Sequence, residues 1–183
     1  MKFIPTPFED LLLIEPKVFN DERGHFFESF NEKEMIQHGI KGPFIQDNQS
    51  VSNKGVLRGL HFQKHPNQQG KLVRVVKGSV IDVVVDLRKE SKTFGKHFSV
   101  ELNEKDKMML WIPIGFAHGF ISLEDDTIFL YKVTDYYHPM TESGIIYNDI
   151  ELNIDWRIKE PMVSPKDKIL PSFKDFRQSF NII

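Results

Sequence analysis

The segment Arg58-Gly-Leu-His-Phe-Gln63 places a histidine and an arginine among apolar residues. A histidine is the natural general base for removing a proton from a carbon next to a carbonyl group. If the segment is a β-strand, Arg58 and Leu60 face one way and Gly59 and His61 face the other. His61 would then lie opposite the small Gly59, which leaves space for a ligand. The alternative is a histidine held in a sheet by ordinary hydrogen bonds.

Other side chains could take part in the same chemistry. Lys71 opens an apolar segment, and a lysine that points into a cavity can stabilise an enolate oxygen by its charge. Tyr131, Tyr136 or Tyr137 can donate a proton or stack on a nucleobase. Asp167 can orient a catalytic histidine, because such pairs meet only in the fold. The ordinary alternatives are a solvated lysine, an edge-strand tyrosine and an aspartate in a surface turn.

The segment Pro113-Ile-Gly-Phe-Ala-His-Gly119 resembles the second cupin signature, in which a proline–glycine turn presents a histidine, here His118, to the lumen of a barrel. In metal-dependent cupins this histidine is a ligand, and the first signature supplies a His-x-His pair and a glutamate. This chain offers His61 and His65 instead, and we expect Pro66 to end their strand. No glutamate falls at a fitting distance, and a catalytic metal needs about three protein ligands. We therefore expect a cupin without its metal.

Short β-strands must position these residues. The predicted strands are rich in β-branched residues and end at turn residues: Lys71–Lys77, Ser79–Leu87, His97–Leu102, Met108–Ile112, His118–Leu123 and Thr127–Val133. Such short, evenly spaced strands predict an antiparallel sandwich or barrel. One helix is predicted where Asn31 can cap it, with Glu34 three residues on and Gly39 at its end. From Met140 we expect packed irregular chain with short helical turns, and at residues 173–183 a tail or a short helix.

The composition is that of an ordinary globular protein, with 40% hydrophobic and 27% charged residues. Its 183 residues predict one domain, residues 1–183. The net charge of −2 gives no sign of a nucleic-acid or membrane-surface partner. The absence of cysteine excludes disulfides, thiolate metal sites and cysteine nucleophiles. Neither a secretory signal nor a membrane span is indicated, so we expect a cytoplasmic protein.

Taken together and in order, several segments resemble the dTDP-4-dehydrorhamnose 3,5-epimerase family. The resemblance runs roughly from residue 3 to residue 170, and its combination of segments is specific although each is weak alone. The matching segments are Asp21–Gly24, Phe26–Phe30, Gln46–Asn48, Arg58–Gln63, Lys71–Val75, Gly78–Val83, Trp111–Phe120, Leu130–Tyr137, Asn148–Asp149 and Ser164–Asp167.

The resemblance implies a mainly β, cupin-like jelly roll (a barrel or sandwich with a few short helices) that forms homodimers. It also implies inversion of C3 and C5 of dTDP-4-keto-6-deoxy-D-glucose through an enolate, without a cofactor. His61 would be the base, oriented by Asp167. Tyr131 would be the acid on the opposite face, and Lys71 would stabilise the enolate oxygen.

The resemblance implies a set of substrate contacts as well. Arg23 and Glu28 belong to a segment that, in the family, reaches the site of the partner subunit. The remaining contacts implied are Arg58 and His118 at the diphosphate or sugar, Gln46, Asp47 and Asn48 at the nucleotide, Tyr137 at thymine, and Glu142 and Lys166 elsewhere on the substrate.

Three positions depart from the residues common in the family. Gln49 replaces a histidine, Tyr147 a tryptophan and His25 a phenylalanine. The identities of the substrate's nucleobase and of its sugar therefore stay open. One alternative is a single-centre epimerase of another 4-keto sugar nucleotide. The others are a metal-dependent cupin, with His61 and His118 as ligands, and a non-catalytic sugar-binding module.

Overall fold

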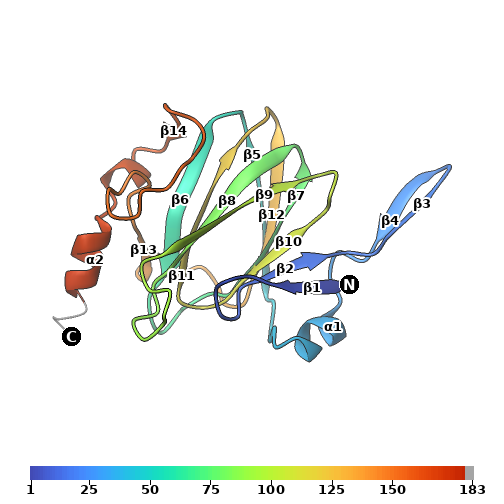
Figure 1. Cartoon of the computed structure of the whole chain (residues 1–183), viewed down its shortest axis with the longest axis horizontal. Helices are drawn as coiled ribbons and strands as arrows, with labels where there is room; N and C mark the ends of the chain where they lie inside the picture. Colours follow the sequence, from blue (N-terminus) through green and yellow to red (C-terminus); the bar gives the residue numbers. More distant parts are fainter. Residues whose placement is uncertain (180–183) are drawn as a thin grey trace.

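The computed structural model describes residues 1–179, and it shows two β-sheets facing each other across a shared interior (Figure 1). The predicted fold class, a mainly β cupin-like jelly roll with few short helices, is confirmed. For the predicted tail or short helix at 173–183, the structure shows helix α2 at Phe173–Ser179, and residues 180–183 lie outside the described residues. None of the helices within residues 1–179 is long and apolar enough to cross a membrane.

The first sheet is antiparallel. Its strands, in spatial order, are β1 (Lys2–Pro5), β2 (Leu12–Glu15), β10 (Met109–Ile112), β7 (Lys71–Lys77), β12 (Thr127–Val133) and β5 (Gln46–Ser52). The second sheet contains β13 (Glu142–Gly144), β6 (Val56–Gln63), β11 (Phe116–Ser122), β8 (Ser79–Asp86) and β9 (His97–Asn103), and β14 (Met162–Val163) pairs in parallel with β6.

The remaining elements lie outside these two sheets. Strands β3 (Val18–Asp21) and β4 (Gly24–Phe27) form a hairpin that projects away from the body of the molecule (Figure 1). The helical elements are α1 (Glu32–Gln37), the 3-10 turn η1 (Asp167–Ile169) and α2.

The interior between the sheets is filled at one end by apolar side chains from both. Val73 and Val75 of β7 and Phe129 of β12 pack with Val80 and Val84 of β8, and all five are buried. The alternation along each strand sends every second residue inward. Burial of this apolar surface is the main term that holds the sheets together. Polar residues at the same inward positions therefore require a specific explanation.

Each sheet is also covered on part of its outer face. The chain after β13 covers the second sheet, where Trp156 and Phe173 join the core. Helix α1 covers one end of the first sheet by placing Met35 against Ile14 and Trp111. Asn31 caps this helix as predicted, since its side chain accepts a hydrogen bond from the Glu34 amide at 3.3 Å.

The predicted strands are confirmed with small shifts of their ends. Lys71–Lys77 and Thr127–Val133 match β7 and β12, and the segment predicted to begin at His118 begins at Phe116 as β11. Strands β1 to β5, β13 and β14 have no predicted bounds, because their segments carry mixed polar and apolar residues. The chain after Met140 is mostly irregular with short elements, as expected.

Candidate active site

Strand β6 carries a bulge that directs the two basic residues of its central segment to the same side. His61 pairs with His118 and Arg58 pairs with Phe120, so β6 has one residue more than β11 between the two pairs. An extra residue reverses the alternation of side chains. Arg58 and His61 therefore both line the interior cavity, and the prediction that they face opposite ways is wrong.

Gly59 has a different role from the one predicted. Its φ is +133°, and a Cβ atom there would lie 2.5 Å from the Cα of Gly119. The glycine thus allows β6 and β11 to approach each other at the bulge, a common reason for glycine in a strand. The prediction that Gly59 leaves space for a ligand is wrong, because the backbone of β11 occupies that space.

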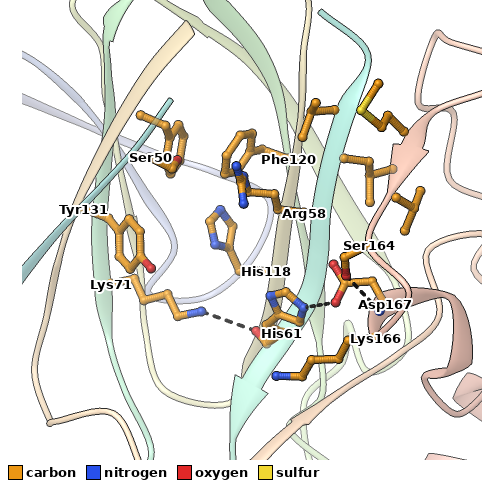
Figure 2. Close-up of a pocket in the computed structure, with 15 residues that line it drawn as sticks. Ser50, Arg58, His61, Lys71, His118, Phe120, Tyr131, Ser164, Lys166 and Asp167 are labelled. Atoms are coloured by element: carbon orange, nitrogen blue, oxygen red, sulfur yellow. Dashed lines mark hydrogen bonds and ion pairs between the residues drawn. The ribbon is translucent and has the colours of Figure 1, made fainter. Parts of the chain in front are cut away.

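The cavity lies between the sheets at the end not filled by the apolar core, and its volume is about 580 Å³ (Figure 2). It brings together His61, Lys71, Tyr131 and Asp167, four residues far apart in the sequence. A neighbouring cavity of about 270 Å³ shares His61, Lys71 and Tyr131 with the first. These three residues therefore stand where the two cavities meet.

His61 is paired with a buried carboxylate. Its Nε2 lies 2.8 Å from Oδ1 of Asp167, which is 4% exposed. The backbone amide of Gly59 donates to Oδ2 of the same aspartate at 3.3 Å. Burial alone would raise the pKa of Asp167, but the hydrogen bond from His61 and the other donors hold it below its usual value. Asp167 can therefore orient His61 and stabilise its protonated form.

Lys71 is a buried cation at the junction of the cavities. Its Nζ donates to the backbone oxygen of His61 at 3.4 Å, and the residue is 9% exposed. Burial lowers the pKa of Lys71 to about 8, although the charges of Asp82 and Glu142 oppose that shift. An ammonium group that is shielded from water in this way can strongly stabilise a developing oxyanion.

His118 is held by an aspartate that the sequence analysis missed. Its Nε2 lies 2.9 Å from Oδ2 of Asp82, and Asp82 is fully buried. Burial lowers the pKa of His118 below its usual value, although Asp82 opposes this shift. A signal was available in the sequence, since Asp82 interrupts the apolar segment Ser79–Asp86 at a position that faces the interior.

Tyr131 and Arg58 face the cavity from different sheets. Tyr131 lies on β12 of the first sheet, across the cavity from His61 on β6 of the second (Figure 2). Burial raises the pKa of Tyr131, so its hydroxyl keeps its proton near neutral pH. The guanidinium of Arg58 is anchored on β5 by hydrogen bonds to Oγ of Ser52 at 3.2 Å and to the backbone oxygen of Val51 at 3.3 Å.

The smaller cavity is lined by polar residues that the sequence analysis predicted as substrate contacts. The Tyr137 hydroxyl donates to Glu142 at 2.7 Å, and Lys166 forms an ion pair with the same carboxylate. Burial alone would raise the pKa of Glu142, but these two partners lower it. Gln46 and Asn48 of β5 complete this wall, where the Gln46 amide donates to Asn48 at 2.8 Å.

Three predicted substrate contacts lie away from both cavities. Arg23 is at the exposed end of the β3–β4 hairpin, where it pairs with Asp21 at 2.7 Å. Glu28 follows that hairpin. Asp47 points from the outer face of β5 and pairs with Lys132 at 2.9 Å. Within a single chain, these residues do not reach the cavity that contains His61.

The side chains that a metal-dependent cupin would use are arranged differently. His65 lies after the end of β6 and lines a separate cavity. His61 and His118 each direct Nε2 to a carboxylate. Across residues 1–179, no group of three or more His, Cys, Asp or Glu side chains could hold a metal ion.

Comparison with known proteins gives consistent matches. A family model described as dTDP-4-dehydrorhamnose 3,5-epimerase matches residues 5–175. A dTDP-4-dehydrorhamnose 3,5-epimerase of Shigella flexneri is 53% identical over 168 residues, which cover 91% of this chain and 93% of the relative.

Solved structures agree. A dTDP-6-deoxy-D-glucose-3,5-epimerase from Legionella pneumophila, in complex with dTDP-4-keto-L-rhamnose, has a TM-score of 0.91 at 48% identity, covering 94% of this chain and 93% of that one. A 3'-monoepimerase from Streptomyces bikiniensis, in complex with dTDP-quinovose, has a TM-score of 0.92 at 31% identity, covering 97% and 90%.

The fold and the site together define a cupin-like barrel whose interior carries a histidine–aspartate pair, a lysine and a tyrosine. The comparisons then narrow this class, and they confirm the resemblance found in the sequence. The chain belongs to the dTDP-4-dehydrorhamnose 3,5-epimerase family and is accordingly an isomerase.

Proposed function

We propose that this chain converts dTDP-4-keto-6-deoxy-D-glucose to dTDP-4-keto-L-rhamnose by inverting C3 and C5, a step toward activated L-rhamnose. One arrangement carries the proposal: the His61–Asp167 pair faces Tyr131 across the cavity, and Lys71 lies beside both. A base and an acid on opposite walls are what inversion at a carbon requires.

The ketone at C4 makes the hydrogens on C3 and C5 acidic. His61 removes one of them as a proton, the electron pair of the C–H bond forms a double bond to C4, and the π pair of the C4 carbonyl moves to its oxygen. The ammonium of Lys71 stabilises the enolate that forms. Tyr131 then gives its proton to the other face of the same carbon, and exchange with water restores both side chains. A second cycle inverts the other carbon.

The polar groups around these residues suit a nucleotide diphosphate. Arg58 and His118 contact the diphosphate or the sugar, and Lys166 supplies a further cation to the substrate. Gln46, Asn48 and Glu142 provide hydrogen-bonding groups in the smaller cavity. Tyr137, which is 50% exposed beside them, offers a ring on which thymine can stack.

The proposal includes a homodimer. The uncovered part of the first sheet exposes Val51 and Val76, at 55% and 41%, and the projecting hairpin exposes Phe19 and Phe26, at 52% and 66%. Exposed apolar surface of this kind suits a subunit interface. A second copy would cover it and would bring Arg23 and Glu28 to its partner's cavity. A cytoplasmic location belongs to the same proposal, and the lack of cysteine is compatible with it.

Proton NMR of dTDP-4-keto-6-deoxy-D-glucose with the enzyme in heavy water tests the reaction. Loss of both the C3 and the C5 proton signals is expected, because each centre passes through an enolate. Loss at one carbon alone would favour a single-centre epimerase, such as the 3'-monoepimerase that this fold matches at 31% identity. No exchange at either carbon would contradict the proposal.

A further inference from the structure

The inner face of β8 carries a buried carboxyl group between two residues of the apolar core. Asp82 lies between Val80 and Val84 on the face that packs against the first sheet, and all three are 0% exposed. One of its oxygens, Oδ2, accepts from His118 at 2.9 Å. The other, Oδ1, is buried and receives no hydrogen bond from residues 1–179. Burying an ionisable group here costs free energy of folding unless the group is paired with neighbouring polar or charged groups.

The first neighbour is His118, whose tautomer Asp82 can determine. An ionised carboxylate only accepts hydrogen bonds, so Nε2 of His118 must carry the proton. Burial favours the neutral ring, which leaves Nδ1 without a proton. Nδ1 receives no hydrogen bond from the part of the chain that the structure describes. Because His118 lines the cavity, this nitrogen can accept a hydrogen bond from a hydroxyl group of a bound sugar (Figure 2).

The second neighbour is Lys71. The charges of two carboxylates, Asp82 of β8 and Glu142 of β13, act on its pKa. The other titratable groups of the cavities around it are Arg58 and His61 of β6, His118 of β11, Tyr131 of β12, Tyr137, Lys166, and Asp167 of η1. Glu142 is already paired with Lys166, and Asp167 is paired with His61. Asp82 has a neutral histidine as its hydrogen-bond partner, so its negative charge remains available to Lys71.

We propose that Asp82 is a positioning residue for the epimerisation. Its carboxylate holds His118 as a hydrogen-bond acceptor for a sugar hydroxyl, and its charge keeps Lys71 an ammonium ion that can stabilise the enolate. This inference rests on the proposed reaction, and Asp82 itself touches neither substrate nor reacting atoms.

Asp82→Asn tests the charge, because the amide oxygen can still accept from His118. Lys71 acts when protonated, so kcat falls as the pH rises through its pKa of about 8. Without the nearby charge this pKa drops, and the alkaline limb of kcat moves to lower pH. A drop of roughly one unit leaves about one eleventh of Lys71 charged at pH 8 instead of about half, so kcat there falls about fivefold. At pH 6 kcat stays within about twofold of wild type.

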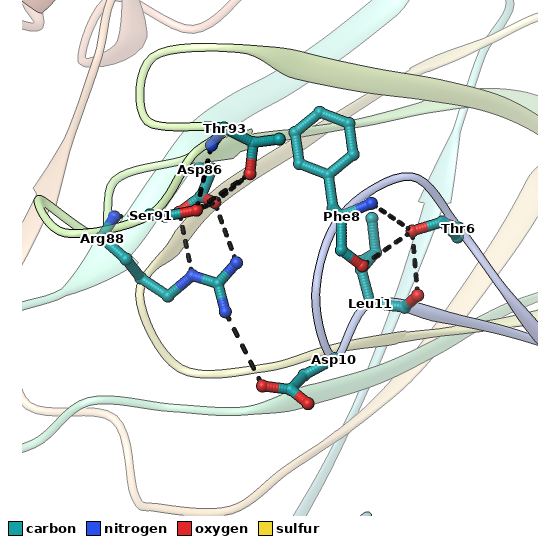
Figure 3. Close-up of polar contacts among 8 residues, drawn as sticks. All are labelled: Thr6, Phe8, Asp10, Leu11, Asp86, Arg88, Ser91 and Thr93. Atoms are coloured by element: carbon teal, nitrogen blue, oxygen red, sulfur yellow. Dashed lines mark hydrogen bonds and ion pairs between the residues drawn. The ribbon is translucent and has the colours of Figure 1, made fainter.

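Asp86→Asn is the matched control. Asp86 is on the same strand and equally buried, but it accepts hydrogen bonds from Arg88, Ser91 and Thr93, away from the cavity (Figure 3). This substitution removes the same charge and lowers stability, yet the alkaline limb should not move. An unchanged pH profile in Asp82→Asn, or an equal shift in Asp86→Asn, would overturn the proposal for Lys71.

The tautomer is measured on the wild-type protein, so it does not depend on whether a variant folds. Nitrogen-15 NMR of the labelled His118 ring at pH 7 should show a protonated Nε2 and an unprotonated Nδ1. A proton on Nδ1, alone or together with Nε2, would overturn the proposal for His118. Exchange of the substrate C3 and C5 protons by wild type is followed in parallel. Absence of exchange would count against the proposed reaction itself. If wild type does exchange these protons but the pH profile or the tautomer is contrary to expectation, only the proposed role of Asp82 is rejected.

Discussion

The one-residue bulge in β6 directs His61 and Arg58 to the same cavity. The proposed chemistry of His61 depends on Asp167, which lies 106 positions later in the sequence. Asp167 is placed at the first residue of η1, where its own amide donates to Ser164. His61 and Asp167 were both predicted from the sequence as site residues, and the structure brings them into contact. The sequence alone could not predict the bulge, because a bulge is a property of two paired strands. For the same reason the predicted role of Gly59, to leave space for a ligand, was wrong. Asp82 was missed although its polar side chain lies within an apolar strand.

Asp167→Asn is the prediction that follows for the histidine pair. The amide can keep the hydrogen bond, but it cannot stabilise the imidazolium that forms when His61 takes a proton. We expect kcat to fall by roughly 10²- to 10⁴-fold with little change in KM. Steady-state kinetics measure this, and a kcat within about twofold of wild type would remove Asp167 from the mechanism.

Strands β6 and β11 act as a unit, because the bulge needs close contact between their backbones. Sequence patterns place strands β7 to β12 well, because β-branched residues alternate or form runs in these segments. They fail for β1 to β5, β13 and β14, where pairing with neighbouring strands and not local propensity decides the conformation.

Gly59→Ala tests the contact between these strands. A Cβ there would clash with the backbone of Gly119 and would also keep a strained φ, so we expect a loss of about 2–4 kcal/mol in the free energy of unfolding. Gly55→Ala is the control, because its φ is +81° but nothing lies within 4 Å of the added Cβ. It should cost about 1 kcal/mol. Denaturant unfolding compares the two, and equal losses would contradict the packing argument.

The hydrogen bonds of Asp86 at the end of β8 predict how stability changes with pH. Burial alone would raise the pKa of Asp86, but hydrogen bonds from Arg88, Ser91 and Thr93 lower it to about 2 (Figure 3). A depressed carboxyl pKa contributes stability above its unfolded value of 3.8. That stability, roughly 2 kcal/mol, is lost as the pH falls through about 2.

Asp86→Asn should lack this contribution, so its stability should fall less steeply than that of wild type between pH 4 and roughly pH 2. Urea unfolding across this range gives both slopes. Identical slopes would show that Asp86 titrates alike in the folded and unfolded protein.

In the single chain, the predicted catalytic residues and the predicted contact Arg23 lie in separate parts of the molecule. His61, Lys71, Tyr131 and Asp167 meet in one chain, whereas Arg23 lies on a projecting hairpin. The fold class followed from strand spacing and from a family resemblance spread over most of the chain. The proposed dimer rests on that resemblance and on the apolar surface of the first sheet.

Subunit complementation tests the dimer. His61→Ala and Arg23→Ala are each expected to have low activity. In a mixed dimer, one site combines the intact His61 of one subunit with the intact Arg23 of the other. With random exchange about half the dimers are mixed and each has one complete site, so mixing should restore roughly a quarter of wild-type activity. No gain, although mixed dimers are detected by mass spectrometry, would contradict a shared site.

The most direct test of the central claim is to measure hydrogen exchange and inversion separately in heavy water. Proton NMR would follow both for wild type, Tyr131→Phe and His61→Ala with dTDP-4-keto-6-deoxy-D-glucose. Because His61 can remove and return hydrogen on one face, Tyr131→Phe should incorporate deuterium at C3 and C5 while producing little inverted sugar. His61→Ala should do neither. Inversion by Tyr131→Phe at the wild-type rate, or exchange by His61→Ala at that rate, would contradict a base and an acid on opposite walls of the cavity.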